Sequence, residues 1–292
     1  MSIDRLQDKI RKTKNPSIID FDIMKEQLPP HLLTEERTYE KAYGRFCVEL
    51  LEGLRGFVPA VKFNFSGFAL LGTEGLVTLS RVLDHSRKMG FYVILEVPEA
   101  LSAQRAKYNA DLIFNNDNAL YYDGILISSY IGSDGIKPYA ERLSETGKSL
   151  FVTIRTANRS ATELQDLLTG GRNVYDAMAD VVNRYKNTQL SKSGYDEIAL
   201  VGPGSSASIL NKLRQKYPNL FILVDGYDYP NTNAKNCAEA MDKFGHGAVI
   251  CGGSSVTAAW LETEHDGLDY VSDAKAAAER MKKNLTRYIA VL

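Results

Sequence analysis

Lys62 and two acidic residues, Asp22 and Glu96, each stand at the end of a short apolar segment. If these segments are neighbouring strands of one sheet, the three side chains meet at one edge, and an Asp22–Lys62 ion pair is expected. Glu96 can join the pair. Two carboxylates around one amine keep the amine protonated. The pattern therefore favours Lys62 as an electrostatic anchor for a ligand over a base or nucleophile, with a salt bridge that binds no ligand as the alternative.

A second candidate site is the sequence Gly252-Gly253-Ser254-Ser255, which follows an apolar segment and precedes an expected helix start at residues 256–260. Glycines let the backbone approach an anion closely, and amides at the start of a helix point towards it. The pattern indicates a site for phosphate or another small anion. A tight turn with a serine cap is the alternative.

Two further groups of charged residues follow later segments. Arg155 and Arg159 are cationic candidates for an anionic ligand. Asp20, Asp225 and Asp228 could form an acidic cluster for a divalent cation, but no spacing rule supports one. The three cysteines are widely spaced and show no zinc pattern. We therefore assign no metal and no cofactor.

Eight short apolar segments, rich in β-branched residues, alternate with amphipathic segments along the whole chain. The expected strands are residues 17–22, 60–65, 91–96, 124–128, 149–154, 197–201, 221–225 and 248–251. Near-continuous apolar runs are typical of parallel strands covered on both faces. Helical spacing predicts helices at 75–89, with Leu76 on the apolar face, at 206–217, and at 273–289 with Ser272 as N-cap. Together they predict one α/β domain over residues 1–292, a single (β/α)8 TIM barrel with its site at the carboxyl ends of the strands.

Composition limits the partners. The chain has 292 residues and a formal net charge of −1, which gives no reason to expect nucleic acid or an anionic membrane surface. No apolar run approaches the roughly 18 residues of a membrane span. Residues 1–14 are charged, unlike a signal peptide. We expect a cytoplasmic protein.

Five segments resemble, in order, motifs of the bacterial long form of orotidine-5′-phosphate decarboxylase. Residues 15–22 resemble NPSVVGLD, 58–62 VPAVK, 129–138 NPYLGSDGIxP, 151–160 FVLVKTSNPS, and 223–227 the start of LVPGYGAQGG. The resemblance runs from about Leu6 to the last helix. It implies a barrel that forms a homodimer, a phosphorylated nucleotide ligand, and the conversion of orotidine 5′-phosphate to UMP and CO2. It places Asp22, Lys62, Thr156, Asn158 and Gly226 in ligand-binding motifs.

The residues that perform the family's chemistry differ in this chain. The family combines the lysine matched by Lys62 with a D-x-K-x-x-D motif, whose alternating charges surround the reacting carbon and whose last Asp reaches across the dimer interface. Here Glu96 replaces the first Asp, Pro98 the Lys and Leu101 the second Asp, at the family's usual interval from Lys62. Proline offers no proton. Only Lys62 and Glu96 remain as a partial catalytic remnant.

Other departures concern substrate binding. Ala157 replaces the family's serine that meets the pyrimidine. Asp228 replaces the second glycine of PGYGAQ, and Pro230 replaces its glutamine. Ser254 replaces the phosphate-binding arginine after the last strand. Together the departures predict a protein that is inactive as a decarboxylase and binds a phosphorylated nucleotide or sugar.

Two alternatives stay open: a functional decarboxylase with non-standard residues, and a non-catalytic interaction module. The first needs an acceleration near the upper end of ~8–23 kcal/mol, most of it from charges placed for the transition state. Arg105 and Lys107 are expected to be solvated helix charges and not a replacement proton donor.

Overall fold

The computed structural model describes residues 1–115, 117, 119–128, 130–187 and 189–290. Ser129, the first residue of the third motif above, lies outside the described residues, as do residues 291–292 of the expected domain.

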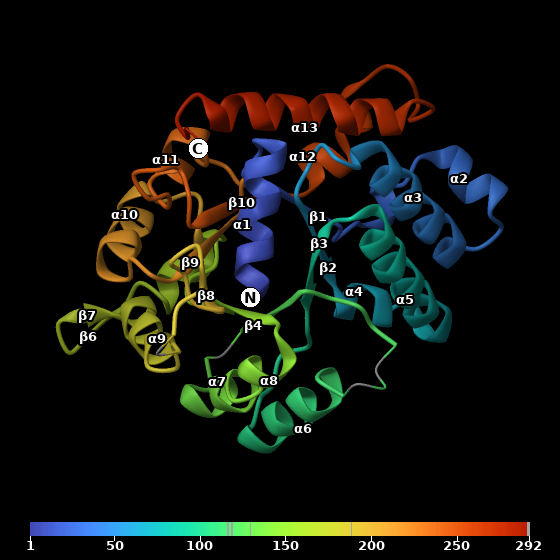
Figure 1. The fold of residues 1–292 in the computed structure, drawn as a ribbon. Helices are drawn as coiled ribbons and strands as arrows, with labels where there is room; N and C mark the ends of the chain where they lie inside the picture. The colour runs from blue at the N-terminus through green and yellow to red at the C-terminus, as the bar shows by residue number, and fades with distance from the viewer. Residues whose placement is uncertain (116, 118, 129, 188, 291–292) are drawn as a thin grey trace.

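Eight parallel strands close into one barrel, in the order β1-β10-β9-β8-β5-β4-β3-β2 (Figure 1). The strands are β1 (Ser17–Asp20), β2 (Ala60–Asn64), β3 (Tyr92–Glu96), β4 (Gly124–Ser128), β5 (Ser149–Thr153), β8 (Ile198–Pro203), β9 (Phe221–Asp225) and β10 (Ala248–Gly252). All eight expected segments form barrel strands, so the predicted (β/α)8 barrel is confirmed. A short antiparallel hairpin, β6 (Leu168–Thr169) and β7 (Arg172–Asn173), projects from the side of the barrel.

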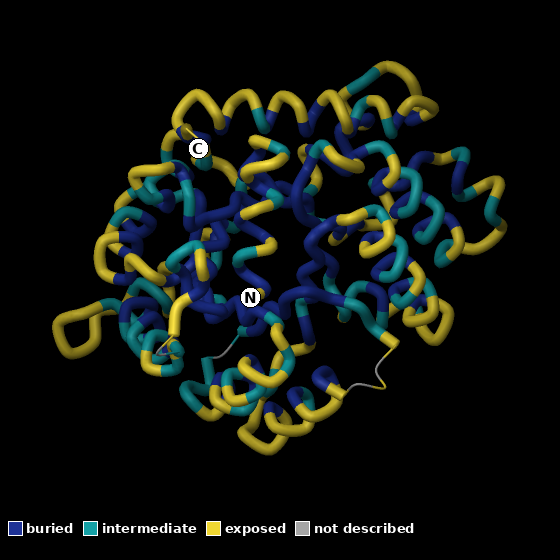
Figure 2. The backbone as a smooth tube through the Cα atoms, viewed as in Figure 1, coloured by how far each residue is buried: buried dark blue, intermediate teal, exposed yellow. Residues whose placement is uncertain are grey.

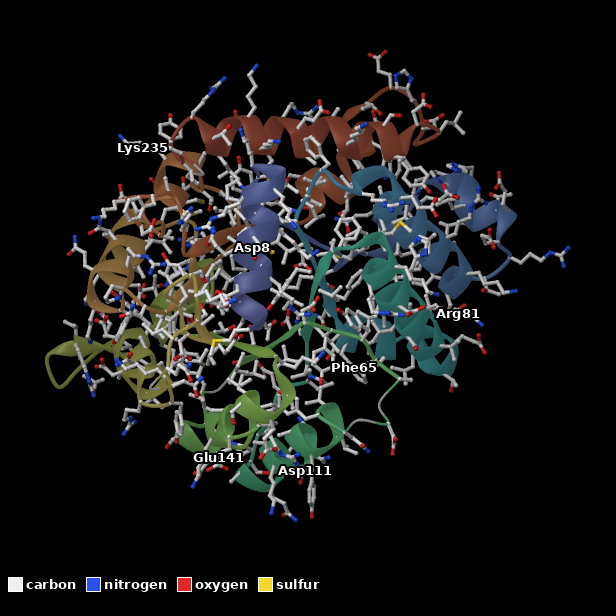
Figure 3. All side chains as sticks on the ribbon, viewed as in Figure 1. Asp8, Phe65, Arg81, Asp111, Glu141 and Lys235 are labelled. Atoms are coloured by element: carbon white, nitrogen blue, oxygen red, sulfur yellow. The ribbon has the colours of Figure 1, made fainter. Side chains whose placement is uncertain are left out.

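Helices follow the strands and surround the barrel. They are α1 (Ser2–Thr13), α2 (Pro30–Glu35), α3 (Tyr39–Leu54), α4 (Phe65–Ala69), α5 (Gly72–Met89), α6 (Ala103–Ile113), α7 (Ser133–Ala140), α8 (Leu143–Thr146), α9 (Val174–Asn183), α10 (Ala207–Lys216), α11 (Ala234–Ala238), α12 (Ser254–Thr257) and α13 (Tyr270–Thr286), with 3-10 turns η1 (Lys25–Gln27), η2 (Arg159–Glu163) and η3 (Ala259–Glu262). Charged side chains of the outer helices, such as Arg81, Asp111 and Glu141, lie at the periphery (Figure 3).

Buried side chains form two layers, because neighbouring residues of a strand point to opposite faces. Outward-facing side chains such as Ile125 pack against the helices, together with Phe46 and Leu83. Inward-facing side chains such as Leu126 and Phe151 fill the interior of the barrel. The barrel strands are accordingly buried except at the last residue of most of them, whereas the helices expose one side to solvent (Figure 2).

Helix α1 closes the amino-terminal end of the barrel and lies across the ring of strands in Figure 1. Its Ile3, Leu6 and Ile10 are fully buried in the interior layer. Its amide at Ile3 donates to the Glu197 carboxylate at 3.1 Å. The side-chain oxygen of Gln7 accepts from Gly247 N–H at 3.1 Å. The helix is therefore part of the core and not an appendage.

The same alternation carries polar groups to the opposite end of the barrel. Interior residues two positions earlier in β1, β2, β3 and β9 are apolar, and each of these strands then places a charged residue inside its carboxyl end: Asp20, Lys62, Glu96 and Asp225. We call this end of the barrel the mouth. The position of an inward-facing residue in its strand decides whether it supports the core or reaches the mouth.

Several bounds and details differ from the sequence-based expectations; for example, β8 continues to Pro203 and α5 begins at Gly72. Strand β1 ends at Asp20, two residues earlier than predicted. Helix α13 begins at Tyr270, and Asp269, not Ser272, is its N-cap, because the carbonyl of Asp269 already accepts from the amide of Ser272. Leu76, expected on the apolar face of its helix, is 38% exposed.

No helix within the described part of the chain is both long and apolar enough to span a membrane.

Candidate functional site at the mouth of the barrel

A cavity of about 570 Å³ opens at the mouth, where the strands end. Five carboxyl groups and one amine line it. These charged residues are Asp20, Asp22, Lys62, Glu96, Asp225 and Asp228. Neutral groups complete the wall, among them Asn64, Tyr227, Tyr229 and Ser254. The walls are polar and carry an excess of negative charge, although the whole chain is nearly neutral.

Lys62 lies at the floor of the cavity between two carboxylates. Its Nζ is 2.8 Å from Asp20 Oδ2 and 2.7 Å from Glu96 Oε2. Asp20 and Lys62 are direct neighbours in the β1–β2 ladder, and Asn64 stands beside Glu96 in the next one. The strand register thus brings both carboxylates to one amine. Glu96 joins Lys62 as expected, and Asp20 supplies the second carboxylate.

The electrostatics keep Lys62 charged. Burial lowers the pKa of the Lys62 ammonium, but Asp20 and Glu96 outweigh this effect and hold that pKa well above its usual value. Burial raises the pKa of Asp20 to about 7, against the opposing influence of Lys62. A lysine that stays protonated is neither a base nor a nucleophile, so Lys62 serves here as a positive charge and a hydrogen-bond donor.

The expected Asp22–Lys62 pair is wrong, since Asp20 takes that place. Asp22 lies beyond the end of β1, is exposed, and lines the outer part of the cavity. A side chain two residues past a strand end is no longer held by the ladder. Asp20, by contrast, is fixed opposite Lys62 by the register.

The glycine–serine loop after β10 already holds an anionic group of the same chain. The Asp228 carboxylate accepts from Gly253 N–H at 2.7 Å and from Ser255 N–H at 3.3 Å. The Ser255 hydroxyl donates to the other carboxylate oxygen of Asp228. Gly253 and Ser254 line the cavity, so the loop does lie at the mouth as expected.

Two of the candidate glycines have clear local roles. Gly226 has φ +77°, and a Cβ there would lie 2.3 Å from the Cβ of Ala157. It permits both the left-handed turn after β9 and the close approach of the segment after β5. A Cβ on Gly252 would lie 2.9 Å from Met281 Sδ, so Gly252 lets α13 pack against β10.

Arg155, Thr156 and Asn158 form a separate group after β5. Arg155 is buried and makes a two-pronged ion pair with Asp166, with Nη2–Oδ2 at 2.9 Å and Nε–Oδ1 at 3.2 Å. Thr156 accepts and donates hydrogen bonds with Gln165, and its hydroxyl also bonds Asn158. None of the three lines the main cavity. The Arg155 guanidinium, which was expected to bind a ligand, is instead paired with the Asp166 carboxylate.

Pro98 and Leu101, which stand in place of the motif's lysine and last aspartate, do not line the cavity at the mouth. Pro98 is exposed and borders a different, apolar hollow beside Phe65 and Leu112. Leu101 is 83% exposed. Arg105 and Lys107 lie on the exposed side of α6, as expected for solvated charges.

Sequence reasoning underrated three residues. It considered Asp20, Asp225 and Asp228 only as a cation cluster, whereas the structure makes the first a partner of Lys62 and the last a partner of the glycine–serine loop. The alternation of Ile18 and Asp20 was an available signal for an inward Asp20. Nothing local indicated that Asp228 folds back onto a loop 25 residues away. Among the described residues, no group of three His, Cys, Asp or Glu side chains is arranged to hold a metal ion.

Comparison of sequences finds relatives along most of the chain. A Rhodopirellula baltica protein named orotidine 5′-phosphate decarboxylase is 29% identical over 255 residues, 84% of each chain. A Clostridium acetobutylicum protein of the same name is 25% identical over 289 residues, 98% of this chain and 99% of its own. No family model matches the chain.

Comparison of structures agrees on the fold. The Leishmania donovani OMP decarboxylase superposes with a TM-score of 0.75 at 22% identity, covering 98% of both chains. The Plasmodium berghei orotidine 5′-monophosphate decarboxylase gives a TM-score of 0.77 at 15% identity, again over 98% of both chains. The curated homologues thus carry the name of the family whose motifs the sequence resembles.

Proposed function

We propose that this orotidine 5′-phosphate decarboxylase-like protein no longer decarboxylates orotidine 5′-phosphate and uses its mouth to bind another small ligand. The observation that carries the proposal is the environment of Lys62. Among the described residues lining the cavity it is the sole cationic side chain, and both of its close partners are carboxylates. The described lining contains no second ammonium group that could protonate the pyrimidine carbon after CO2 leaves.

Charge balance supports the same conclusion. Decarboxylation builds negative charge on the pyrimidine, which a catalyst must stabilise with positive groups placed in advance. In this mouth five carboxyl groups surround one amine. The motifs quoted above have glycine, proline and glycine where this chain has Asp20, Asp225 and Asp228. Each of these differences adds a carboxyl group to the lining of the mouth.

A phosphorylated nucleotide or sugar is the second candidate for the ligand. The relatives' name implies such a substrate, and the Gly252–Ser255 loop favours it, because its amides point towards a bound anion. Against it stand the negative walls of the cavity and the loss of a basic residue at Ser254. We therefore regard a ligand without a phosphate group as the better fit to this geometry.

The proposal is tested by incubating the purified protein with orotidine 5′-phosphate and following loss of the orotate absorbance. We expect no turnover above buffer in the wild type or in Lys62→Ala, while the Clostridium acetobutylicum relative serves as the active reference. Turnover by the wild type that Lys62→Ala abolishes would refute the proposal, because it would show that this mouth decarboxylates orotidine 5′-phosphate without a second ammonium group.

We also propose the homodimer that the resemblance implies. Leu101 and Tyr108, 83% and 49% exposed, support an apolar contact on the β3–α6 side of the barrel. Light scattering after size exclusion should give about twice the chain mass of 32.5 kDa, and Leu101→Asp should shift the equilibrium towards the monomer. A wild-type mass of one chain at micromolar concentration would contradict the dimer.

A further inference from the structure

Asp228 occupies the position in which the loop after β10 would hold a ligand's anion. One carboxylate oxygen takes two backbone amides, those of Gly253 at 2.7 Å and Ser255 at 3.3 Å, and the other takes the Ser255 hydroxyl. These three donors, two amides and a hydroxyl converging on one anionic group, are the kind that a phosphate oxygen meets in a glycine-rich loop. The donors are consequently satisfied without any ligand.

The geometry makes this contact specific to Asp228. Asp22 lines the same cavity and is exposed to a similar degree, but no hydrogen bond from the loop reaches it. A Cβ on Gly253 would lie 3.4 Å from Asp228 Oδ2, which is an ordinary van der Waals contact, so Asp228 packs directly against this residue. Removing the carboxylate would leave the donors of Gly253 and Ser255 without this partner.

We propose that Asp228 determines the ligand class of the mouth: as a built-in anion it fills the loop after β10 and excludes phosphate monoesters. The inference deepens the proposed function and rests on it, because a ligand-binding mouth is its premise. A phosphate in the loop would have to displace the carboxylate and then remain beside it, so like charge and lost hydrogen bonds oppose binding together.

The test compares phosphate binding by the wild type, Asp228→Gly, Asp228→Asn and Asp22→Asn. Asp228→Gly restores the residue of the family motif, and Asp228→Asn keeps the side-chain size while removing its charge. Asp22→Asn is the matched control, since it removes one charge from the same cavity without touching the loop. Affinity for inorganic phosphate and for UMP is measured by calorimetry at constant ionic strength, alongside the melting temperature in phosphate and in chloride.

We expect phosphate and UMP to bind both Asp228 variants at least about tenfold more tightly than the wild type or Asp22→Asn, as the release of charge-assisted donors implies. Equal gains in Asp22→Asn and the Asp228 variants would overturn the inference, since charge alone would then explain them. Tight binding by the wild type, or no gain in either Asp228 variant, would overturn it as well.

Failure of this inference is distinguishable from failure of the proposed function. Asp228→Gly leaves Lys62, Glu96 and Pro98 unchanged, so it should gain phosphate affinity while remaining silent towards orotidine 5′-phosphate. Turnover by the wild type refutes the proposed function whatever the phosphate result. If the wild type does not turn over orotidine 5′-phosphate and the Asp228 variants bind phosphate no more tightly than the wild type, only the role of Asp228 is refuted.

Discussion

Replacing Lys62 with methionine should lower the free energy of unfolding by about 3–5 kcal/mol at pH 8, the cost of leaving a buried charge without its partner. Lys62 is 6% exposed and bonds both Asp20 and Glu96. Methionine has a similar length but no charge. The variant therefore isolates the electrostatic role of the amine from its packing.

The loss should shrink as the pH falls. The pKa of Asp20, about 7 in the folded protein, already exceeds its ordinary value of 3.8, so the folded state holds a proton that the unfolded state releases between these values. Stability from this group is complete below pH 4 and is lost as the pH rises through 7. Without Lys62 the folded pKa rises further, and the loss at pH 8 becomes larger.

Urea denaturation at pH 5 and pH 8 measures both effects. Lys137→Met provides the comparison, because Lys137 is a 60% exposed helix lysine whose nearest carboxylate is 3.7 Å away. It should change stability by no more than about 0.5 kcal/mol at either pH. A Lys62→Met protein as stable as the wild type at pH 8 would show that the two carboxylates do not need the amine.

A second large effect is expected at the opposite end of the barrel. Leu6→Ala should destabilise the fold by about 2–5 kcal/mol, the usual cost of a cavity left by a buried leucine. Leu6 is fully buried in the interior layer, where it meets side chains from the barrel strands. Leu168→Ala, in the projecting hairpin and 76% exposed, is the control and should be nearly neutral. Equal effects of the two substitutions would mean that α1 does not seal the core.

The sequence was sufficient to predict the barrel because the information is local. Each strand is an apolar run of about five residues, and β4 and β9 have the predicted bounds. The predicted β1 was two residues too long, since Phe21 continues the apolar run and hides the point where pairing stops. Composition alone could not decide between Asp20 and Asp22 as the partner of Lys62. The ladder register of β1 and β2 decides it.

The parts of the site that the sequence could not reveal depend on contacts between distant segments. The Asp228–Gly253 contact joins the loops after β9 and β10, and the Arg155–Asp166 pair joins residues 11 positions apart in the segment after β5. The residue types in both are equally compatible with a solvated surface. The sequence placed Lys62, Glu96 and the glycine–serine loop at the mouth, but it also placed Arg155 there, and it did not show which groups are already engaged with one another. Unpaired amides and an unpaired arginine would favour a phosphate ligand, whereas the same groups bonded to Asp228 and Asp166 do not. For this reason the geometry disagrees with the expectation of a phosphate ligand.

The helix that closes the base of the barrel also constrains the order of folding. Gln7 of α1 accepts a hydrogen bond from Gly247, 240 positions later, and Ile3 donates to Glu197. During synthesis α1 leaves the ribosome long before these partners exist, so its apolar face must wait uncovered while most of the strands are made. Contacts of such sequence separation slow folding and expose the chain to aggregation. The nascent protein should therefore depend on chaperones more than its finished stability would suggest.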